Sequence, residues 1–150
     1  MSKHLLVSVF MVLVFSVVNG QSVSESRKIA DFIHDSANAK KFLSREVDRN
    51  AIQVVFVFEG KRYTVNAGNG HSVLSYWVRP SGTVSSDRVS LSIFYDTDVD
   101  GVVDFGTKGV TEDHLFNRNS NRGIEHIPYW QEQYRSAVVQ TLRFIASKQP

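Results

Sequence analysis

The sequence predicts one α+β domain: an N-terminal helix, an antiparallel meander of about five strands and a C-terminal helix, with both helices on one face of the sheet. Three observations predict this fold. Apolar residues recur at helical spacing before residue 48, at alternate positions between residues 51 and 106, and at helical spacing again after Pro128. Short turns such as residues 68–70 join the alternating runs, and short connections favour antiparallel neighbours.

The chain opens with an apolar segment that is expected to be a secretory signal peptide, residues 1–20. Lys3 supplies the positive end, and residues 5–18 form an almost unbroken apolar run. Val18 and Gly20 are small enough for the −3 and −1 positions of a cleavage site. The run is shorter than the roughly twenty residues that cross a bilayer, so cleavage is favoured over an uncleaved anchor.

Removal of this segment would leave a single domain, residues 21–150, which is expected to be secreted or periplasmic. The chain contains no cysteine, so its core must hold the fold without disulfides, and a domain of this length can do so. The net charge of +2 is too balanced to favour nucleic acid or an anionic membrane. We therefore expect a protein or small-molecule partner, and no membrane span after signal removal.

Two amphipathic helices are predicted at the ends of this domain. The apolar positions of the first are Ile29, Phe32, Ile33, Leu43 and Val47. Pro128 suits the first turn of the second, because the amide that proline lacks would have no partner there. The apolar stripe of the second helix is Trp130, Tyr134, Ala137, Val138, Thr141, Leu142 and Ile145.

Between the helices, alternating apolar residues predict the strands. Each run is rich in β-branched or aromatic side chains and ends near turn-forming residues. The runs are residues 52–58, 62–67, 72–78, 88–95 and 102–106. Residues 108–125 show little periodicity, and their polar part is expected to be a surface loop.

One turn of this meander carries a candidate metal site. From Asp96 to Asp104, aspartates occupy the first, third, fifth and ninth positions, and Gly101 occupies the sixth. Alternate side chains of a tight loop can turn toward one point, and Ca²⁺ takes roughly six to eight oxygen ligands. Carboxylates this close repel each other unless a cation or solvent separates them. The spacing therefore indicates a Ca²⁺ loop in a β-hairpin.

The pattern Asp-x-Asp-x-Asp-Gly-x-x-Asp resembles the calcium-binding loops of dockerins, thrombospondin type 3 repeats and integrin alpha-subunit propellers. The resemblance covers nine residues of the chain. Val99 departs from it, because that position often has a left-handed backbone, which a β-branched residue resists. The metal ligands that the resemblance implies are the side chains of Asp96, Asp98, Asp100 and Asp104 and the backbone carbonyl of Val102.

Other interpretations of the same residues are possible. Aspartate and glycine dominate turns, so a bare polar turn is an alternative. An EF-hand would have a glutamate at the twelfth position, where this chain has Thr107. Residues 94–102 also resemble the first motif of haloacid dehalogenase-type phosphatases, which implies Asp98 as nucleophile and Asp100 as acid. Only about fifty residues follow this motif, too few for the βαβ units of roughly thirty residues that such a fold needs.

Two further groups of residues are candidates for a site. His114 and His126 flank the polar loop, but their spacing matches no metal-binding template. The order of elements loosely resembles cystatin-like and NTF2-like folds, in which a helix crosses a curved antiparallel sheet and a pocket can lie between them. Tyr63, Tyr76 and Trp77 are candidates to line such a pocket, or they belong to the core.

The sequence thus favours an exported, non-enzymatic binding or accessory domain with one structural calcium loop. The first alternative is a partner-binding protein, such as an inhibitor or assembly factor, that uses a sheet edge. The second is a small pocket-bearing enzyme. The phosphate-binding glycine loop, the nucleophile-elbow motif and the zinc-protease motif are absent from the sequence, and no cysteine can act as nucleophile. An enzyme is therefore the least favoured of the three, and no catalytic residue is assigned.

Overall fold

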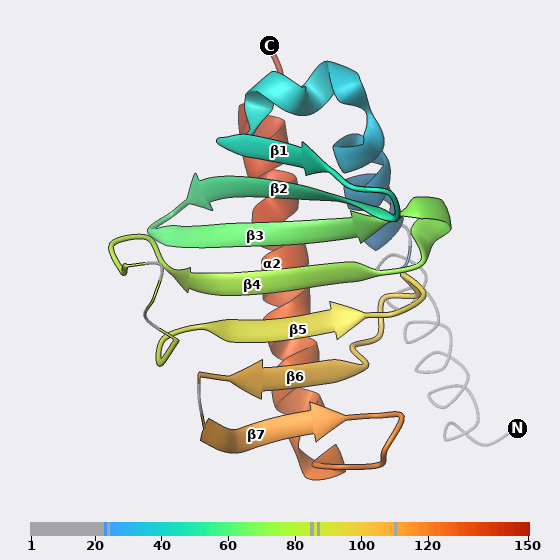
Figure 1. Cartoon of the computed structure of the whole chain (residues 1–150), viewed down its shortest axis with the longest axis vertical. Coiled ribbons are helices and arrows are strands. Elements are labelled where there is room, and N and C mark those ends of the chain that lie inside the picture. The colour runs from blue at the N-terminus through green and yellow to red at the C-terminus, as the bar shows by residue number, and fades with distance from the viewer. Residues whose placement is uncertain (1–22, 24, 85, 87, 110) are drawn as a thin grey trace, which may run out of the picture.

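Seven antiparallel strands form one sheet, and a long C-terminal helix runs behind it (Figure 1). The computed structural model describes residues 23, 25–84, 86, 88–109 and 111–150, with the backbone alone at residues 111–113. The expected signal peptide, residues 1–20, lies outside the described residues. The predicted α+β class, with one helix before the sheet and one after it, is confirmed.

The strands lie in the sheet in the order of the sequence, and each neighbouring pair is antiparallel. Their bounds are β1 Ser44–Val47, β2 Ala51–Phe58, β3 Lys61–Gly68, β4 Leu74–Pro80, β5 Ser92–Asp96, β6 Phe105–Lys108 and β7 Thr111–Asn117. The N-terminal helix covers residues 25–34, and α2 covers Ile127–Ser147. Short 3-10 helices are formed by Ser36–Lys41, Asn69–His71 and Ile124–His126.

The prediction of five strands is wrong, and one of the two missed strands is the edge strand β1. Leu43 and Val47 are four residues apart, which mimics one face of a helix. Both side chains are in fact exposed, by 66% and 67%. The N-terminal helix ends at residue 34, and the Asp35 side chain then accepts a hydrogen bond from the amide of Ala37 and starts a 3-10 turn. The chain is thereby turned into the sheet.

The other missed strand, β7, forms the opposite edge of the sheet and lies in the segment predicted to be a loop. Its sequence is mostly polar, so it lacks the alternation of the central strands. Phe116 is fully buried and pairs with Gly106 of β6. An edge strand needs few apolar side chains, and its signal in the sequence is correspondingly weak.

The hydrophobic core lies between the sheet and the two helices. Pro128 stands in the first turn of α2, as predicted. Of the apolar stripe predicted for this helix, Leu142 is partly buried and the rest is buried. The N-terminal helix contributes Ile29 and Ile33 to the same core. The largest fully buried side chains are Trp130, Tyr76, Tyr134, Phe56, Phe94 and Phe116.

Trp130 lies directly against the backbone of β6. A Cβ atom at Gly106 would overlap the indole ring, so glycine is the residue that permits this close packing. On the other face of the sheet the chain's second tryptophan, Trp77, is 46% exposed. No helix in the described part of the chain is both long and apolar enough to cross a membrane.

Candidate metal centre

The segment from Asp96 to Asp104, here called the aspartate loop, joins β5 to β6 and packs against the core. Asp96 is the last residue of β5, and Asp104 directly precedes β6. Val99 and Val103 are fully buried. Val99 has a left-handed backbone with φ 54°, which β-branched residues resist. Burial of its side chain offsets that cost and fastens the loop to the core.

Gln131 of α2 holds the loop from the helix side. Its side-chain amide donates a hydrogen bond to the carbonyl of Gly101 at 2.9 Å, and its side-chain carbonyl accepts one from the amide of Val103 at 3.0 Å. The Arg118 guanidinium donates to the carbonyl of Val103 at 3.0 Å. These hydrogen bonds hold the loop backbone in place without a bound ion.

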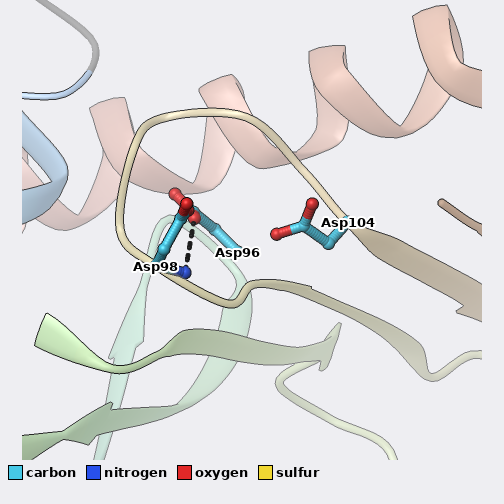
Figure 2. A group of neighbouring side chains, drawn as sticks. All are labelled: Asp96, Asp98 and Asp104. Carbon is cyan, nitrogen blue, oxygen red and sulfur yellow. Dashed lines mark hydrogen bonds between the residues drawn. The ribbon is translucent and has the colours of Figure 1, made fainter. Parts of the chain in front are cut away.

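Three of the four aspartates converge across the loop. One carboxylate oxygen from each of Asp96, Asp98 and Asp104 lies within 4.8 Å of the others. Figure 2 shows Asp96 and Asp98 side by side and Asp104 pointing toward them from the other end of the loop. Ca²⁺–oxygen distances are roughly 2.3–2.6 Å, so two ligands of one ion lie no more than about 5 Å apart. The three carboxylates can therefore hold a metal ion.

Asp100, a further predicted ligand, is not part of this three-carboxylate cluster. Asp100 is exposed, and its Oδ1 accepts a hydrogen bond from the amide of Val102 at 2.8 Å. That contact is a local turn between residues two apart, which aspartate commonly forms. The involvement of Asp100 and of the Val102 carbonyl stays a prediction.

Asp96 is the buried member of the cluster, and both its oxygens accept hydrogen bonds. Oδ1 accepts from the amides of Asp98 at 3.4 Å and Asp100 at 3.1 Å. Oδ2 accepts from the amide of Gly101 at 2.8 Å and from the hydroxyl of Tyr134 at 2.9 Å. Successive amides that converge on one anion form a concave nest, in which the side chain organises the turn. Asp96 therefore shapes the loop through its own contacts.

A buried hydroxyl chain connects Asp96 to both helices. The Tyr134 hydroxyl lies 2.9 Å from Asp96 Oδ2 and 2.9 Å from the Ser26 hydroxyl. A phenol has one proton, so when Tyr134 donates to Asp96 it accepts from Ser26. The sequence analysis did not predict these hydrogen bonds, because Ser26 and Tyr134 are 108 residues apart. One feature of the sequence could have indicated them. A tyrosine within an apolar helical stripe has a hydroxyl group, and that hydroxyl needs a buried hydrogen-bond partner.

Asp104 is the third member of the cluster, and it has partners on two sides. Its Oδ2 accepts hydrogen bonds from the amide and the hydroxyl of Thr97, both at 2.8 Å. Its Oδ1 lies 3.4 Å from Nε of Arg118, whose side chain is 40% exposed. The Asp104 side chain is only 14% exposed, but solvent around the arginine screens the pair, so Arg118 neutralises only part of the local negative charge.

Burial raises the pKa values of two aspartates of the loop. It raises the pKa of Asp96 from 3.8 to about 6, although hydrogen bonds from Gly101, Tyr134 and Asp100 oppose the shift. Burial also raises the pKa of Asp100, and the nearby charges of Asp98 and Asp104 add to that effect. A cation among these oxygens would favour the ionised forms and act in the opposite direction.

This pKa shift predicts how stability depends on pH in the calcium-free protein. The folded state binds the Asp96 proton more tightly than the unfolded state. The resulting stabilisation is complete below pH 3.8 and is lost as the pH rises through about 6. Relative to Asp96→Asn, which carries no charge, we expect the wild type to lose about 1–3 kcal/mol of unfolding free energy between pH 4 and pH 7.

Urea denaturation of both proteins in EDTA across this pH range measures that difference. Tyr134, Asp98, Asp100 and Asp104 are the ionisable groups that face Asp96 or lie beside it. The asparagine variant keeps all four, so the comparison isolates the proton on Asp96. A constant difference between the two proteins from pH 4 to pH 7 would contradict the shift.

The histidines that flank the polar loop are close together in the structure. The rings of His114 and His126 have centroids 5.0 Å apart, and the His114 ring lies 5.2 Å from that of Tyr129. His126 Nε2 is 3.5 Å from Glu125. The three-carboxylate cluster is the only group of at least three metal-ligating side chains found among the described residues, and these histidines do not belong to it.

The three aromatic residues considered for a pocket have different surroundings. Tyr63 lines a cavity between the sheet and α2. Tyr76 is fully buried, and its hydroxyl lies 3.2 Å from that of Thr141. Trp77 points to the opposite, open face of the sheet.

The aspartate loop thus offers three convergent carboxylates on a backbone that the core holds in place. Its donor atoms are all oxygens, which suits a hard divalent cation. No family model, curated protein or solved structure matches the chain.

Proposed function

We propose that this protein is an exported, non-enzymatic binding or accessory domain in which the aspartate loop holds one structural Ca²⁺. The proposal depends on the convergence of Asp96, Asp98 and Asp104 within 4.8 Å. Oxygen ligands favour Ca²⁺ or Mg²⁺ over transition metals. Mg²⁺ demands a near-ideal octahedron at about 2.0–2.1 Å, whereas Ca²⁺ accepts irregular sets at longer distances. Export is inferred from the apolar N-terminal segment of the sequence.

A structural role is favoured over a catalytic one because the protein already holds most of the loop. Asp96 and Asp104 accept hydrogen bonds from their own loop. An ion bound there would neutralise repelling carboxylates and tie the end of β5 to the start of β6. Asp98 is exposed and lies at the solvent side of the cluster, so it leaves a route by which the ion can enter.

Thermal melting with and without Ca²⁺ tests this proposal. An ion that binds only the folded state adds about 2.7 kcal/mol of stability at a concentration of one hundred times Kd. We expect the melting temperature to rise steadily with Ca²⁺ concentration and to rise less with Mg²⁺. Identical melting curves in EDTA and in millimolar Ca²⁺ would remove the proposal's support.

The variant Asp98→Asn separates ion binding from folding. The Asp98 carboxylate is exposed, unlike the buried carboxylate of Asp96. We therefore expect Asp98→Asn to leave the melting temperature in EDTA unchanged and to raise the Ca²⁺ concentration needed for half of the thermal shift at least tenfold. Removal of one anionic ligand of a hard cation is the physical reason.

The matched control is Glu46→Gln, which removes one exposed charge on β1, outside the cluster. It should reproduce the wild-type response to Ca²⁺. If Asp98→Asn responds like this control, then Asp98 is not a ligand. A loss of melting temperature in EDTA would instead give Asp98 a folding role that the structure does not indicate.

A second candidate function is partner binding at the sheet edge β1. Leu43 and Val47 are exposed there, and an edge strand offers unpaired backbone groups to an extended peptide. Such a partner would slow amide hydrogen exchange in β1 and leave exchange in α2 unchanged. If the β1 amides exchanged at the same rate with and without the partner, then this edge would not be the binding surface.

A further inference from the structure

A second candidate site is the cavity between the sheet and α2. The cavity has a volume of about 200 Å³ and is lined by residues of β3, β4, β5, β6 and the first half of α2. Ser92 lines it from the first position of β5, whereas Asp96 ends that strand. Tyr129, Gln133 and Ser136 line it from one face of α2, at helical spacing. The two candidate sites thus sit at opposite ends of β5.

The sheet side of the cavity changes from apolar to polar along one row of paired residues. Tyr63 pairs with Val78, Val78 with Ser92, and Ser92 with Lys108. All four line the cavity, and Tyr63 is 2% exposed, so this row faces the helix side of the sheet. Ser92 therefore occupies a half-buried position on the inward face, and Lys108, which is exposed, ends the row at the rim of the cavity.

Tyr63 contributes a hydrogen-bonding group to the cavity. Its side chain stacks on Phe56 at 4.9 Å between ring centroids. Among the described residues its hydroxyl has no hydrogen-bond partner, and no fully buried side-chain polar atom is left unpaired there. The hydroxyl therefore opens into the cavity. Burial, together with the nearby charge of Glu59, raises the pKa of Tyr63, so it stays a neutral donor at ordinary pH. Either water or an acceptor group of a ligand can pair with the hydroxyl there.

The charge of the lining specifies the kind of ligand. Lys61 and Lys108 both line the cavity, and none of its described lining residues is acidic. Lys61 is two positions from Tyr63 on β3, so both project from the same face of the sheet. Together with the Tyr63 hydroxyl, these ammonium groups supply hydrogen-bond donors of the kind that hold a carboxylate or phosphate.

The remaining lining is apolar and limits the size of the ligand. Phe94 and Ala137 are 2% and 4% exposed and form an apolar floor. A water molecule takes about 30 Å³ of liquid volume, and covalently bonded atoms take less. The cavity of about 200 Å³ therefore holds on the order of ten non-hydrogen atoms.

We propose that this cavity binds a small organic anion, with its anionic group at Lys61, Lys108 and the Tyr63 hydroxyl and its apolar body on Phe94 and Ala137. This activity is separate from the calcium loop, and neither depends on the other. Binding of a metabolite-sized acid would give the domain a ligand as well as a structural ion.

Titration with three probes tests the proposal. Benzoate combines a carboxylate with an apolar ring, benzyl alcohol keeps the ring without the charge, and inorganic phosphate keeps the charge without the ring. We expect saturable benzoate binding at low salt by isothermal titration calorimetry, with the other two at least tenfold weaker. Each titration is run in EDTA and in millimolar Ca²⁺, so failure of this site is distinguishable from failure of the calcium loop.

Variants identify the groups that hold the anion. Lys61→Met and Lys108→Met keep an apolar stem and remove the charge, and each should weaken benzoate at least tenfold. Tyr63→Phe should weaken it severalfold while keeping the aromatic stack. Lys28→Met removes an equal charge from the N-terminal helix, outside the cavity, and should change the affinity less than twofold.

Three results would overturn the assignment. The first is no benzoate binding up to 10 mM by a protein with a cooperative melting transition. The second is benzyl alcohol or phosphate binding as tightly as benzoate, which would show a plain apolar cavity or a plain anion site. The third is an equal effect of Lys28→Met and the two cavity-lysine variants, because only long-range charge would then matter.

Discussion

Replacing Asp96 by alanine is expected to lower the free energy of unfolding by about 3 kcal/mol or more in the absence of any divalent cation. The Asp96 side chain is fully buried and accepts hydrogen bonds from three loop amides and the Tyr134 hydroxyl. Alanine would leave the buried amide of Gly101 without an acceptor and would remove the acceptor of two part-buried amides, and each buried unpaired donor costs about 1–3 kcal/mol. Urea denaturation at pH 7 in EDTA measures the change.

Two further variants serve as controls for this substitution. Asp98→Ala removes the exposed carboxylate of the same cluster and should leave the stability in EDTA unchanged. Asp96→Asn keeps an acceptor oxygen and should cost less than alanine. If Asp96→Ala and Asp98→Ala lowered the free energy of unfolding equally, then the hydrogen bonds of Asp96 would not hold the loop. The hydrogen bonds that link Asp96 to Tyr134 and Ser26 would then have no stabilising effect.

Replacing Trp130 by alanine is expected to cost about 3–5 kcal/mol, because it removes a large buried side chain and leaves a cavity. Trp130 is fully buried, packs on Phe94 at 5.9 Å between ring centroids, and covers the backbone of Gly106. Its loss would separate the start of α2 from β6. Chemical denaturation, with the slope checked for two-state behaviour, measures the effect.

The other tryptophan provides the control for this prediction. Trp77 is 46% exposed and follows the buried Tyr76 on β4, so it lies on the opposite face of the sheet, and Trp77→Ala should cost much less. Equal losses from the two substitutions would mean that the open face of the sheet is covered in solution, or that the packing of Trp130 on Gly106 is not a main source of stability.

Much of the fold could be predicted from the sequence because it follows from local periodicity. The helical stripe from Trp130 to Ile145 and the proline at its start identify α2. Alternation in residues 51–58 identifies β2, whose two faces differ in burial. The edge strands were missed because one face of an edge strand has little to pack against. The exposed Leu43, just before β1, and the exposed Val47, at its end, therefore carried no information about a buried face.

The candidate site was predicted in part, and the limit has a physical cause. The spacing of Asp96, Asp98 and Asp104 in the sequence placed them in one turn, and the structure brings these three together. The direction of each side chain depends on backbone angles that spacing does not determine. Val99 adopts a positive φ and is buried, and Asp100 turns to the amide of Val102. The Tyr134 contact with Asp96 requires the tertiary fold.

The two proposed sites share strand β5 and use different chemistry. At one end of β5, the carboxylates of the aspartate loop present negative charge to a cation. Near the other end, Lys61 of β3 and Lys108 of β6 present positive charge around a partly apolar cavity. Opposite charges at the two ends of one strand allow both ligands to bind the same domain without competing for residues.

Isothermal titration of Ca²⁺ into the calcium-free protein tests the central claim most directly. The account predicts one saturable binding event per chain, weakened at least tenfold by Asp98→Asn and unaffected by Glu46→Gln. A protein that melts cooperatively yet takes up no Ca²⁺ at millimolar concentration would show that the three convergent carboxylates form a turn held by their own hydrogen bonds and not a metal centre.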